Sequence, residues 1–290
     1  MQSRCKQKTL TIAFCGAPNV GKSTLLNRLL GCKLAICSPK PQTTRFNIKG
    51  IMTKNDTQLV FIDTPGIFRP KLSELEKQIV KEAWKGLCGV DLVCLIIDGK
   101  KGNIDGSTKT IIEKTALNDV PIIAVINKSD CLSMDEKIIF AEKLSKTKRF
   151  VDIFSLSAKT GRGCDELLKY LFNSAHEGKW SFDEDALTDK DNNFICSEFV
   201  REQLFIILSK ELPYMLSCET EFFEENENNI AISVVVKISK ASHKKMILGA
   251  NGRNLKKVIH KASLNLEKLL GKSVNLKIFV KLEKKNNYAR

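Results

Sequence analysis

One stretch decides the fold of the N-terminal part of the chain: Gly16-Ala17-Pro18-Asn19-Val20-Gly21-Lys22-Ser23-Thr24. It follows the apolar run Leu10 to Cys15 and precedes a segment with helical spacing. A Gly-x-x-x-x-Gly-Lys-Ser pattern between a strand and a helix predicts a loop whose backbone N–H groups surround a triphosphate. In such a loop Lys22 neutralises the β and γ oxygens, and Ser23 binds Mg²⁺.

Further apolar runs alternate with helical periodicity after this loop. They are continuous, which is typical of strands buried on both faces of a mostly parallel sheet. Phe46 to Thr53 instead alternates and precedes the turn signal Asn55-Asp56-Thr57, so we expect a hairpin at one edge. The sequence therefore predicts an α/β P-loop domain, with helices on both faces of a sheet whose further strands are Leu59–Ile62, Leu92–Ile97, Ile122–Ile126 and Val151–Phe154.

The base is indicated by Asn127-Lys128-Ser129-Asp130, which follows one of these strands. A carboxylate at Asp130 can accept hydrogen bonds from the N1–H and exocyclic amine of guanine, whereas adenine would leave it unpaired. The aliphatic stem of Lys128 would cover one face of the ring. Ser157-Ala158-Lys159, after the next strand, would offer backbone N–H groups to the guanine carbonyl. These motifs together predict a GTP site.

Asp63-Thr64-Pro65-Gly66 completes the predicted phosphate site. Asp63 is placed to hold Mg²⁺ through water, and the Gly66 N–H to bond the γ-phosphate. The next residue, Ile67, has no group that could position the attacking water. We expect either slow unaided hydrolysis or another group that supplies the charge and positions the water.

With a hydrophobic residue after Gly66, the chain resembles the TrmE/Era/EngA/septin-related GTPases, whose members typically have one at that position. Through that resemblance Asn19 matches a K⁺-coordinating asparagine, with a simple turn residue as the alternative interpretation. Switch I is residues 38–46, and the family's Gln-Thr-Thr-Arg pattern is present as Gln42-Thr43-Thr44-Arg45, followed by Phe46. The resemblance implies that Thr44 binds Mg²⁺ in the GTP state and that Thr43 lies near K⁺. The implied catalytic residues are Lys22, Asn19, Thr44 and Gly66, and the implied metal ligands are Ser23, Thr44 and Asp63.

Charge separates the C-terminal part of the chain from the rest. The sequence has 47 Lys and Arg against 33 Asp and Glu, a net charge of +14. Fourteen of the basic residues and two of the acidic ones lie between Lys237 and Lys285, so this segment carries +12 of the +14. Such a concentration indicates a surface for a polyanion, either nucleic acid or an anionic membrane.

The same segment contains Gly249-Ala250-Asn251-Gly252 within the predicted order α-β-β-α-α-β, which resembles a type II KH domain. We expect a helix over Ser197–Glu211 ended by Pro213, strands over 216–223, 230–238 and 274–280, and a long helix Arg253–Leu270. A Gly-x-x-Gly turn lets a nucleic-acid backbone approach two helices closely. The predicted RNA-binding residues are Lys244, Lys245, Gly249, Ala250, Asn251, Gly252, Arg253, Lys256 and Lys257.

The two domains together resemble the Era family of ribosome-assembly GTPases. The resemblance implies GTP hydrolysis, binding of the 3′ end of 16S rRNA through the KH domain, action in 30S subunit maturation, and a monomer in the cytoplasm with some peripheral contact to the inner membrane. The turn departs from the family in having Ala250 and Asn251 where lysine is common, and Met215 and Ser263 also differ. The absence of lysine from the turn would place more of the phosphate contact on Arg253, Lys244 and Lys245, and the departures together would alter RNA affinity or sequence preference without abolishing binding.

The boundaries predicted from this pattern are a G domain over 1–174, a linker over 175–195, a KH domain over 196–285 and a polar tail over 286–290. The scattered cysteines show no zinc spacing, so we expect small buried side chains in a reducing compartment. No apolar run is long enough to span a bilayer. Two alternatives stay open: an RNA-binding chaperone that hardly hydrolyses GTP, and a GTPase whose basic segment binds anionic lipid.

Overall fold

The computed structural model describes residues 6–70, 74–115, 119–209 and 211–283. The chain divides into two compact units. The first unit comprises residues 1–37 and 44–189, and the second comprises residues 38–43 and 190–290. The short segment 38–43 therefore belongs to the unit that is formed by the C-terminal third of the chain. The predicted tail over 286–290 lies outside the described residues.

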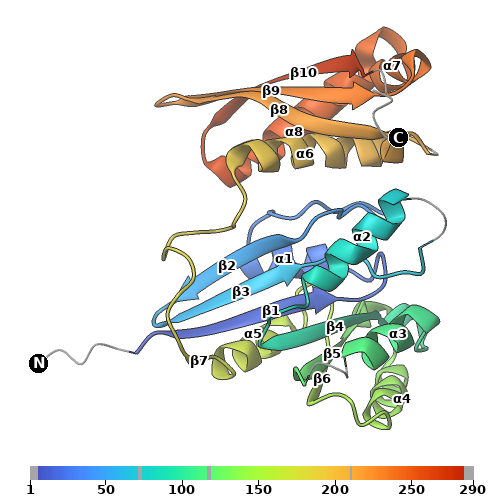
Figure 1. The fold of residues 1–290 in the computed structure, drawn as a ribbon, viewed down its shortest axis with the longest axis vertical. Helices are drawn as coiled ribbons and strands as arrows, with labels where there is room; N and C mark the ends of the chain where they lie inside the picture. Colours follow the sequence, from blue (N-terminus) through green and yellow to red (C-terminus); the bar gives the residue numbers. More distant parts are fainter. Residues whose placement is uncertain (1–5, 71–73, 116–118, 210, 284–290) are drawn as a thin grey trace, which may run out of the picture. The chain divides into compact units, whose positions relative to one another are not determined.

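The first unit is a largely parallel sheet between helices (Figure 1), as the apolar runs predict. The strand order is β2-β3-β1-β4-β5-β6, and only β2 in this path is antiparallel to its neighbour. The strands are β1 (Lys8–Cys15), β2 (Ile48–Lys54), β3 (Thr57–Asp63), β4 (Leu92–Asp98), β5 (Ile122–Asn127) and β6 (Asp152–Ser155). The helices are α1 (Lys22–Leu30), α2 (Glu74–Lys85), α3 (Gly106–Thr115), α4 (Met134–Ser145) and α5 (Cys164–Asn173), with short 3₁₀ turns η1 (Gly99–Lys101) and η2 (Ser129–Cys131).

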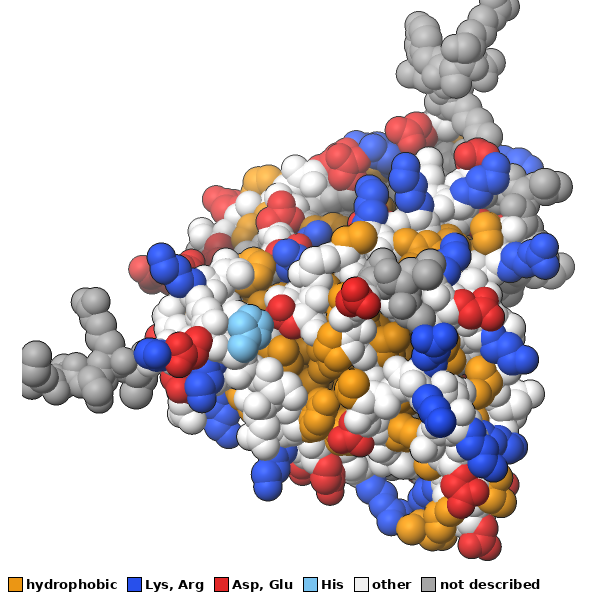
Figure 2. Space-filling model, turned by 60° about the horizontal axis from the view of Figure 1, so that its bottom comes forward, with side chains coloured by type: hydrophobic (Ala, Val, Ile, Leu, Met, Phe, Trp, Pro, Cys, Tyr) orange, Lys and Arg blue, Asp and Glu red, His pale blue; other side chains and the backbone are white. Residues whose placement is uncertain are grey.

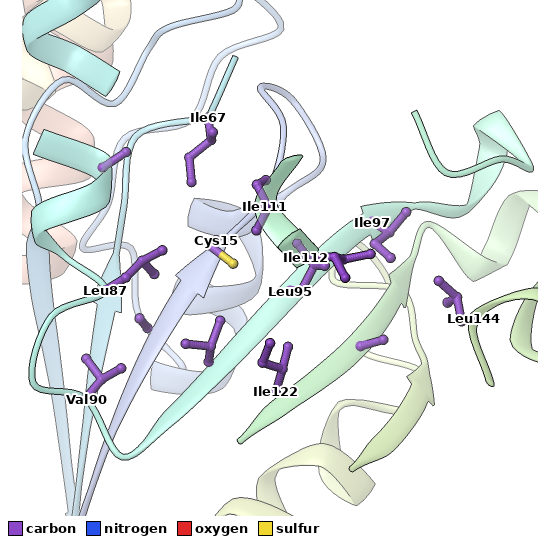
Figure 3. Packing of buried hydrophobic residues seen from close by; sticks show 14 of the residues in the cluster. Cys15, Ile67, Leu87, Val90, Leu95, Ile97, Ile111, Ile112, Ile122 and Leu144 are labelled. Carbon is purple, nitrogen blue, oxygen red and sulfur yellow. The ribbon is translucent and has the colours of Figure 1, made fainter. Parts of the chain in front are cut away.

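Continuous apolar runs form the centre of this sheet because both of its faces are covered. Every residue of β3, β4 and β5 is buried. On one face the β4 and β5 side chains pack with α2, α3 and α4 in a single hydrophobic cluster, part of which is drawn in Figure 3. A strand that is buried on both sides cannot alternate polar and apolar residues, which explains the sequence pattern.

Residues 175–189, predicted as a linker, lie along the first unit. β7 (His176–Glu177) pairs antiparallel with the start of β1. The Trp180 indole N–H donates to the Lys8 carbonyl oxygen at 3.1 Å. The buried Gln58 side chain accepts from the backbone N–H groups of Ser181 and Phe182, both at 3.1 Å. These contacts give the segment a fixed course that its irregular composition does not reveal.

The second unit has the predicted order α-β-β-α-α-β. Its elements are α6 (Asn192–Ile207), β8 (Leu216–Glu225), β9 (Asn229–Ile238), α7 (Ala241–Leu248), α8 (Arg253–Leu270) and β10 (Ser273–Leu282), with 3₁₀ turns η3 (Leu212–Met215) and η4 (Ala250–Gly252). The strand order is β10-β9-β8, with β10 parallel and β8 antiparallel to β9. Helices α6 and α8 cover one face of this sheet (Figure 1).

Two expectations for the second unit were inaccurate. Helix α6 begins at Asn192, five residues earlier than predicted, because the Asp191 side chain caps it by accepting from the Phe194 N–H at 2.7 Å. It ends at Ile207 because Leu208 is extended, and Pro213 lies in the separate turn η3.

One face of the molecule carries mixed charge. Figure 2 brings forward the bottom of Figure 1, and on that face basic and acidic side chains are interspersed. Within the described residues, no helix is long and apolar enough to cross a membrane, and no three His, Cys, Asp or Glu side chains form a group that could hold a metal ion. The expectation that the cysteines are buried is wrong for Cys88 and Cys131, which are exposed.

Candidate nucleotide site and RNA interface

The predicted phosphate loop lies at the point where the strand order reverses. β1 has β3 on one side and β4 on the other, so the chain proceeds from β1 to both halves of the sheet. In sheets of this kind the carboxyl ends of the strands on either side of such a point form a crevice for ligands. Residues 16–21 connect β1 to α1 at that edge.

Two glycines of the loop lie where no side chain would fit. A Cβ at Gly16, whose φ is +147°, would lie 2.3 Å from the Ile96 carbonyl oxygen. A Cβ at Gly21, with φ +101°, would lie 2.3 Å from the Asn127 side-chain nitrogen. The loop therefore packs directly on β4 and on the Asn127 motif, and it leads into the N-terminus of α1, where an anion is favoured.

Lys22, Ser23, Asp63 and Thr44 converge beside this loop. The buried Lys22 ammonium donates to the carbonyl oxygens of Gly16 and Ala17 at 3.2 and 3.0 Å. The Ser23 hydroxyl donates to Asp63 Oδ2 at 2.6 Å and lies 3.1 Å from the Thr44 hydroxyl. Side chains that are 21 and 40 positions from Ser23 in the sequence thus join it in one polar cluster.

Burial dominates the ionisation of this cluster. Desolvation raises the pKa of Asp63 to about 6, although the Ser23 hydrogen bond and the Lys22 charge oppose the shift. Desolvation also lowers the pKa of Lys22, and Asp63 opposes that shift. The second Asp63 oxygen, Oδ1, is buried and has no hydrogen-bond partner. A cation beside Asp63 would satisfy this oxygen and favour the carboxylate.

Gly66 and Ile67 fix the loop that follows β3. A Cβ at Gly66 would lie 2.7 Å from Pro18 Cα, so this glycine sits against the phosphate loop. The Ile67 N–H donates to the Gly16 carbonyl oxygen at 3.0 Å. Its side chain is 3% exposed and points into the hydrophobic cluster near Cys15 and Leu87 (Figure 3). Ile67 therefore anchors the loop and presents nothing to a water molecule.

Asn127 joins the base motif to the two other loops of the site. Its amide donates to the Val20 carbonyl oxygen at 2.8 Å. Its Oδ1 accepts from the N–H groups of Lys128 and Ala158 at 2.8 and 2.9 Å. One side chain thus holds the phosphate loop, the Asn-Lys-x-Asp motif and the Ser-Ala-Lys loop in register.

Lys128 and Asp130 have different surroundings. The Lys128 ammonium donates to the Asn19 carbonyl oxygen at 2.9 Å and to Asp98 Oδ2 at 2.7 Å. Asp130 is exposed, and a hydrogen bond from the Ser157 hydroxyl holds its pKa below the ordinary value. Asp130 is therefore a carboxylate at neutral pH and can accept from a base.

The other predicted nucleotide-site residues surround these groups. The Thr64 hydroxyl donates to the Phe14 carbonyl oxygen at 2.7 Å, and the Ser129 N–H to the Leu156 carbonyl oxygen at 3.1 Å. The remainder are buried (Ala17, Val20, Pro65, Ser157, Ala158), half-buried (Thr24) or exposed (Lys159).

The predicted switch I residues separate at one peptide bond. Thr44, Arg45 and Phe46 belong to the first unit, whereas Gln42 and Thr43 belong to the second. The Thr43 hydroxyl donates to the Lys40 carbonyl oxygen at 2.8 Å and lies 2.6 Å from the Ser38 hydroxyl. Its resemblance-based role near K⁺ stays a prediction.

The Gly-x-x-Gly turn of the second unit has positive φ at both of its glycines. Gly249 and Gly252 have φ of +72° and +73°, and Asn251 between them also has positive φ, +50°. Beside the turn is a shallow hollow of about 510 Å³, lined by Ala250, Asn251, Arg253, Lys256, Lys257 and His260. Lys244 and Lys245 are exposed on α7 but do not line it.

Three residues that lie at these sites were not predicted from the sequence, because none of them belongs to a motif. The Arg28 guanidinium donates to the carbonyl oxygens of Ala158 and Lys159 at 3.1 and 2.6 Å, and so supports the predicted base loop. The Asn254 amide donates to the Met246 carbonyl oxygen at 3.1 Å across the Gly-x-x-Gly turn. His260 follows Lys256 and Lys257 at helical spacing, which could have indicated its place beside the hollow.

Sequence comparisons match the two parts of the chain to two families. Residues 11–128 match the family described as 50S ribosome-binding GTPase, and residues 211–287 match the KH domain family. GTPase Era from Rickettsia bellii (strain RML369-C) is 43% identical over 282 residues, which cover 96% of this chain and 93% of that protein. The chain belongs to the Era family of GTPases. Another Era relative, from Ehrlichia ruminantium (strain Welgevonden), is 40% identical over 93% of this chain and 91% of its own length.

Two solved Era structures resemble nearly the whole chain. One is a crystal structure of Era with MgGDPNP and nucleotides 1506–1542 of 16S ribosomal RNA, with a TM-score of 0.88 and 32% identity over 96% of this chain and 95% of that one. The other is a point variant of Aquifex aeolicus Era bound to GDP.AlF4⁻, with a TM-score of 0.90 at the same identity and coverage. The predicted α/β P-loop domain followed by a KH domain is confirmed.

Proposed function

We propose that this Era-family chain hydrolyses GTP with Mg²⁺ at the Lys22–Ser23–Asp63–Thr44 cluster and binds the 3′ end of 16S rRNA through its Gly-x-x-Gly turn. The main support for this proposal is that the phosphate loop, Asp63 and the guanine motif converge at one edge of the first sheet. The solved Era complex with MgGDPNP and 16S nucleotides supports both halves of the proposal.

The polar cluster fits a hard cation. Hydroxyl and carboxylate oxygens are the ligands that Mg²⁺ prefers. Ser23 and Thr44 supply hydroxyls 3.1 Å apart, and Asp63 has a buried oxygen without a hydrogen-bond partner. These three residues would hold Mg²⁺, which when bound stabilises the charge that develops on the phosphate oxygens.

The chain's own residues would bind and orient the nucleotide. Lys22 releases the Gly16 and Ala17 carbonyl oxygens and donates to the β and γ oxygens. The Gly66 N–H approaches the γ-phosphate from a loop that packs on Pro18. Asp130 accepts from the guanine N–H groups, and Lys128, anchored at Asn19 and Asp98, covers the ring.

Because Ile67 is packed in the core, it cannot position the attacking water. A bound cation or the RNA would supply the charge and the positioning instead. We propose K⁺ at Asn19, on the family resemblance. Single-turnover GTP hydrolysis would be measured in K⁺ and in Na⁺, with and without a 3′-terminal 16S rRNA oligonucleotide, and Ser23→Ala would give the background. We expect a faster reaction with K⁺ or RNA. A rate at background in every condition would favour the non-hydrolysing chaperone.

The RNA interface can be tested with matched glycine substitutions. Gly252→Asp would place a carboxylate in the turn, where a Cβ has no atom within 4 Å, but the φ of +73° strains any side chain. A control with the same strain is therefore needed. Gly271→Asp is the control, because Gly271 has nearly the same φ, +72°, and equally open space at the end of α8. We expect Gly252→Asp to weaken binding of the oligonucleotide at least tenfold and Gly271→Asp to leave it unchanged. Equal affinities for the two variants would remove the turn from the interface.

The salt dependence of RNA affinity tests whether the basic segment binds RNA through its charge. The logarithm of the association constant should fall with log[salt] by about 0.7 for each single-strand phosphate neutralised. Liposome flotation that persists with competing RNA would instead support lipid binding by the basic segment. Action in 30S maturation, the monomeric state and cytoplasmic location remain proposals that rest on the family resemblance.

A further inference from the structure

The segment 38–43 is attached to the second unit by its own set of contacts. The Lys40 ammonium donates to the carbonyl oxygens of Phe205 and Leu208 at the C-terminal end of α6. A cation is favoured there because the last carbonyl groups of a helix lack intrahelical partners. The Tyr214 hydroxyl donates to the Pro41 carbonyl oxygen at 3.2 Å.

The third attachment is Arg201 of α6, 158 positions away from Thr43 in the sequence. Its Nη2 donates to the Thr43 carbonyl oxygen at 2.7 Å. The same guanidinium forms a two-pronged ion pair with Glu198, with Nε–Oε1 and Nη2–Oε2 distances of 2.6 and 2.5 Å. The Arg201 side chain is 3% exposed, so these contacts are shielded from bulk solvent.

Stability alone does not account for this arrangement. Replacing a buried ion pair with well-packed apolar residues is often neutral or stabilising. Arg201 Nη1 is also buried without a hydrogen-bond partner, which disfavours folding further. A buried guanidinium is well suited, however, to holding a carboxylate and a backbone carbonyl in one plane.

The residue after Thr43 is attached to the first unit instead. The Thr44 hydroxyl lies 3.1 Å from Ser23, which donates to Asp63. The Thr43 carbonyl group and the Thr44 N–H and Cα belong to the same planar peptide group. A hydrogen bond that fixes the Thr43 oxygen therefore restricts the direction in which Thr44 leaves that plane.

We propose that Arg201 is a positioning residue for Thr44: by holding the Thr43 carbonyl it orients the switch I threonine, and it carries any nucleotide-dependent movement of Thr44 into α6. The inference rests on the proposed function, because it needs Thr44 to respond to GTP. Coupling of this kind is reciprocal, so a ligand that changes α6 also changes the affinity for GTP.

The test uses hydrogen–deuterium exchange of the full-length protein with GDP and with a non-hydrolysable GTP analogue. In the wild type, peptides from α6 should exchange at different rates in the two states. Arg201→Lys keeps a cation beside Glu198, but a lysine cannot form the two-pronged ion pair and also reach the Thr43 carbonyl oxygen. The difference in α6 exchange rate between the two nucleotide states should therefore fall below half of the wild-type value. Single-turnover hydrolysis should fall about tenfold, as expected for the loss of one charge-assisted hydrogen bond.

Controls separate this inference from folding and from the proposed function. Arg149→Lys, on an exposed residue of the first unit, should leave the exchange difference unchanged. If Arg201→Lys does not fold, Lys40→Met removes the neighbouring attachment and should reduce the same difference. The inference alone would be overturned if the wild type hydrolyses GTP but its α6 peptides exchange equally in the two nucleotide states. It would also be overturned if the variants keep the full exchange difference. A wild type that does not hydrolyse GTP would overturn the proposed function.

Discussion

Replacing Asp63 by asparagine should change how the stability of the first unit depends on pH. The side chain is fully buried, and burial raises its pKa from 3.8 to about 6. A carboxyl group with a raised pKa stabilises the folded state below pH 3.8, and this contribution is lost as the pH rises through 6. The shift of about 2 pKa units corresponds to about 3 kcal/mol at about 1.36 kcal/mol per unit. The wild type should lose most of it between about pH 4 and 7, whereas Asp63→Asn should not.

The assay is urea unfolding without nucleotide and with EDTA, followed by tryptophan fluorescence. Both tryptophans, Trp84 and Trp180, lie in the first unit. The burial of an amide adds a cost that does not depend on pH, so the difference in unfolding free energy between about pH 4 and 7 isolates the ionisation of Asp63. Asp185→Asn, which removes an exposed carboxylate, is the control. A stability difference between Asp63→Asn and wild type that stays constant with pH would refute the argument.

Three further changes test the site. Gly66→Ala should lower GTP hydrolysis at least tenfold because its Cβ would lie 2.7 Å from Pro18, whereas Gly106→Ala, with nothing within 4 Å, should be neutral in the same single-turnover assay. Asp130→Asn should shift preference from guanine to xanthine nucleotides, and unchanged GTP affinity would exclude Asp130 from the base site. Ile67→Gln should destabilise the protein by about 2 kcal/mol or more because it buries an amide, without a faster reaction; accelerated hydrolysis would contradict the core placement of this residue.

Local patterns predicted most of the strands and one helix closely. Helix α8 spans Arg253–Leu270 as its periodicity and the following Gly271 indicate. The start of α6 was missed because the sequence carries two competing signals: an irregular polar stretch and a capping residue, Asp191. Burial likewise could not be predicted for Cys88 and Cys131, since an isolated cysteine carries no periodicity.

The sequence by itself determined the phosphate loop, the guanine motif and the Gly-x-x-Gly turn, because each is a short run whose spacing and residue types dictate the local backbone. The tertiary structure decided which groups these runs meet. It directed Ile67 into the core, joined Lys128 to Asp98, and brought Arg201 to the carbonyl of Thr43. Such pairings depend on how distant segments pack. A local pattern that fixes one element leaves its partners undetermined, as the division of switch I between two units illustrates.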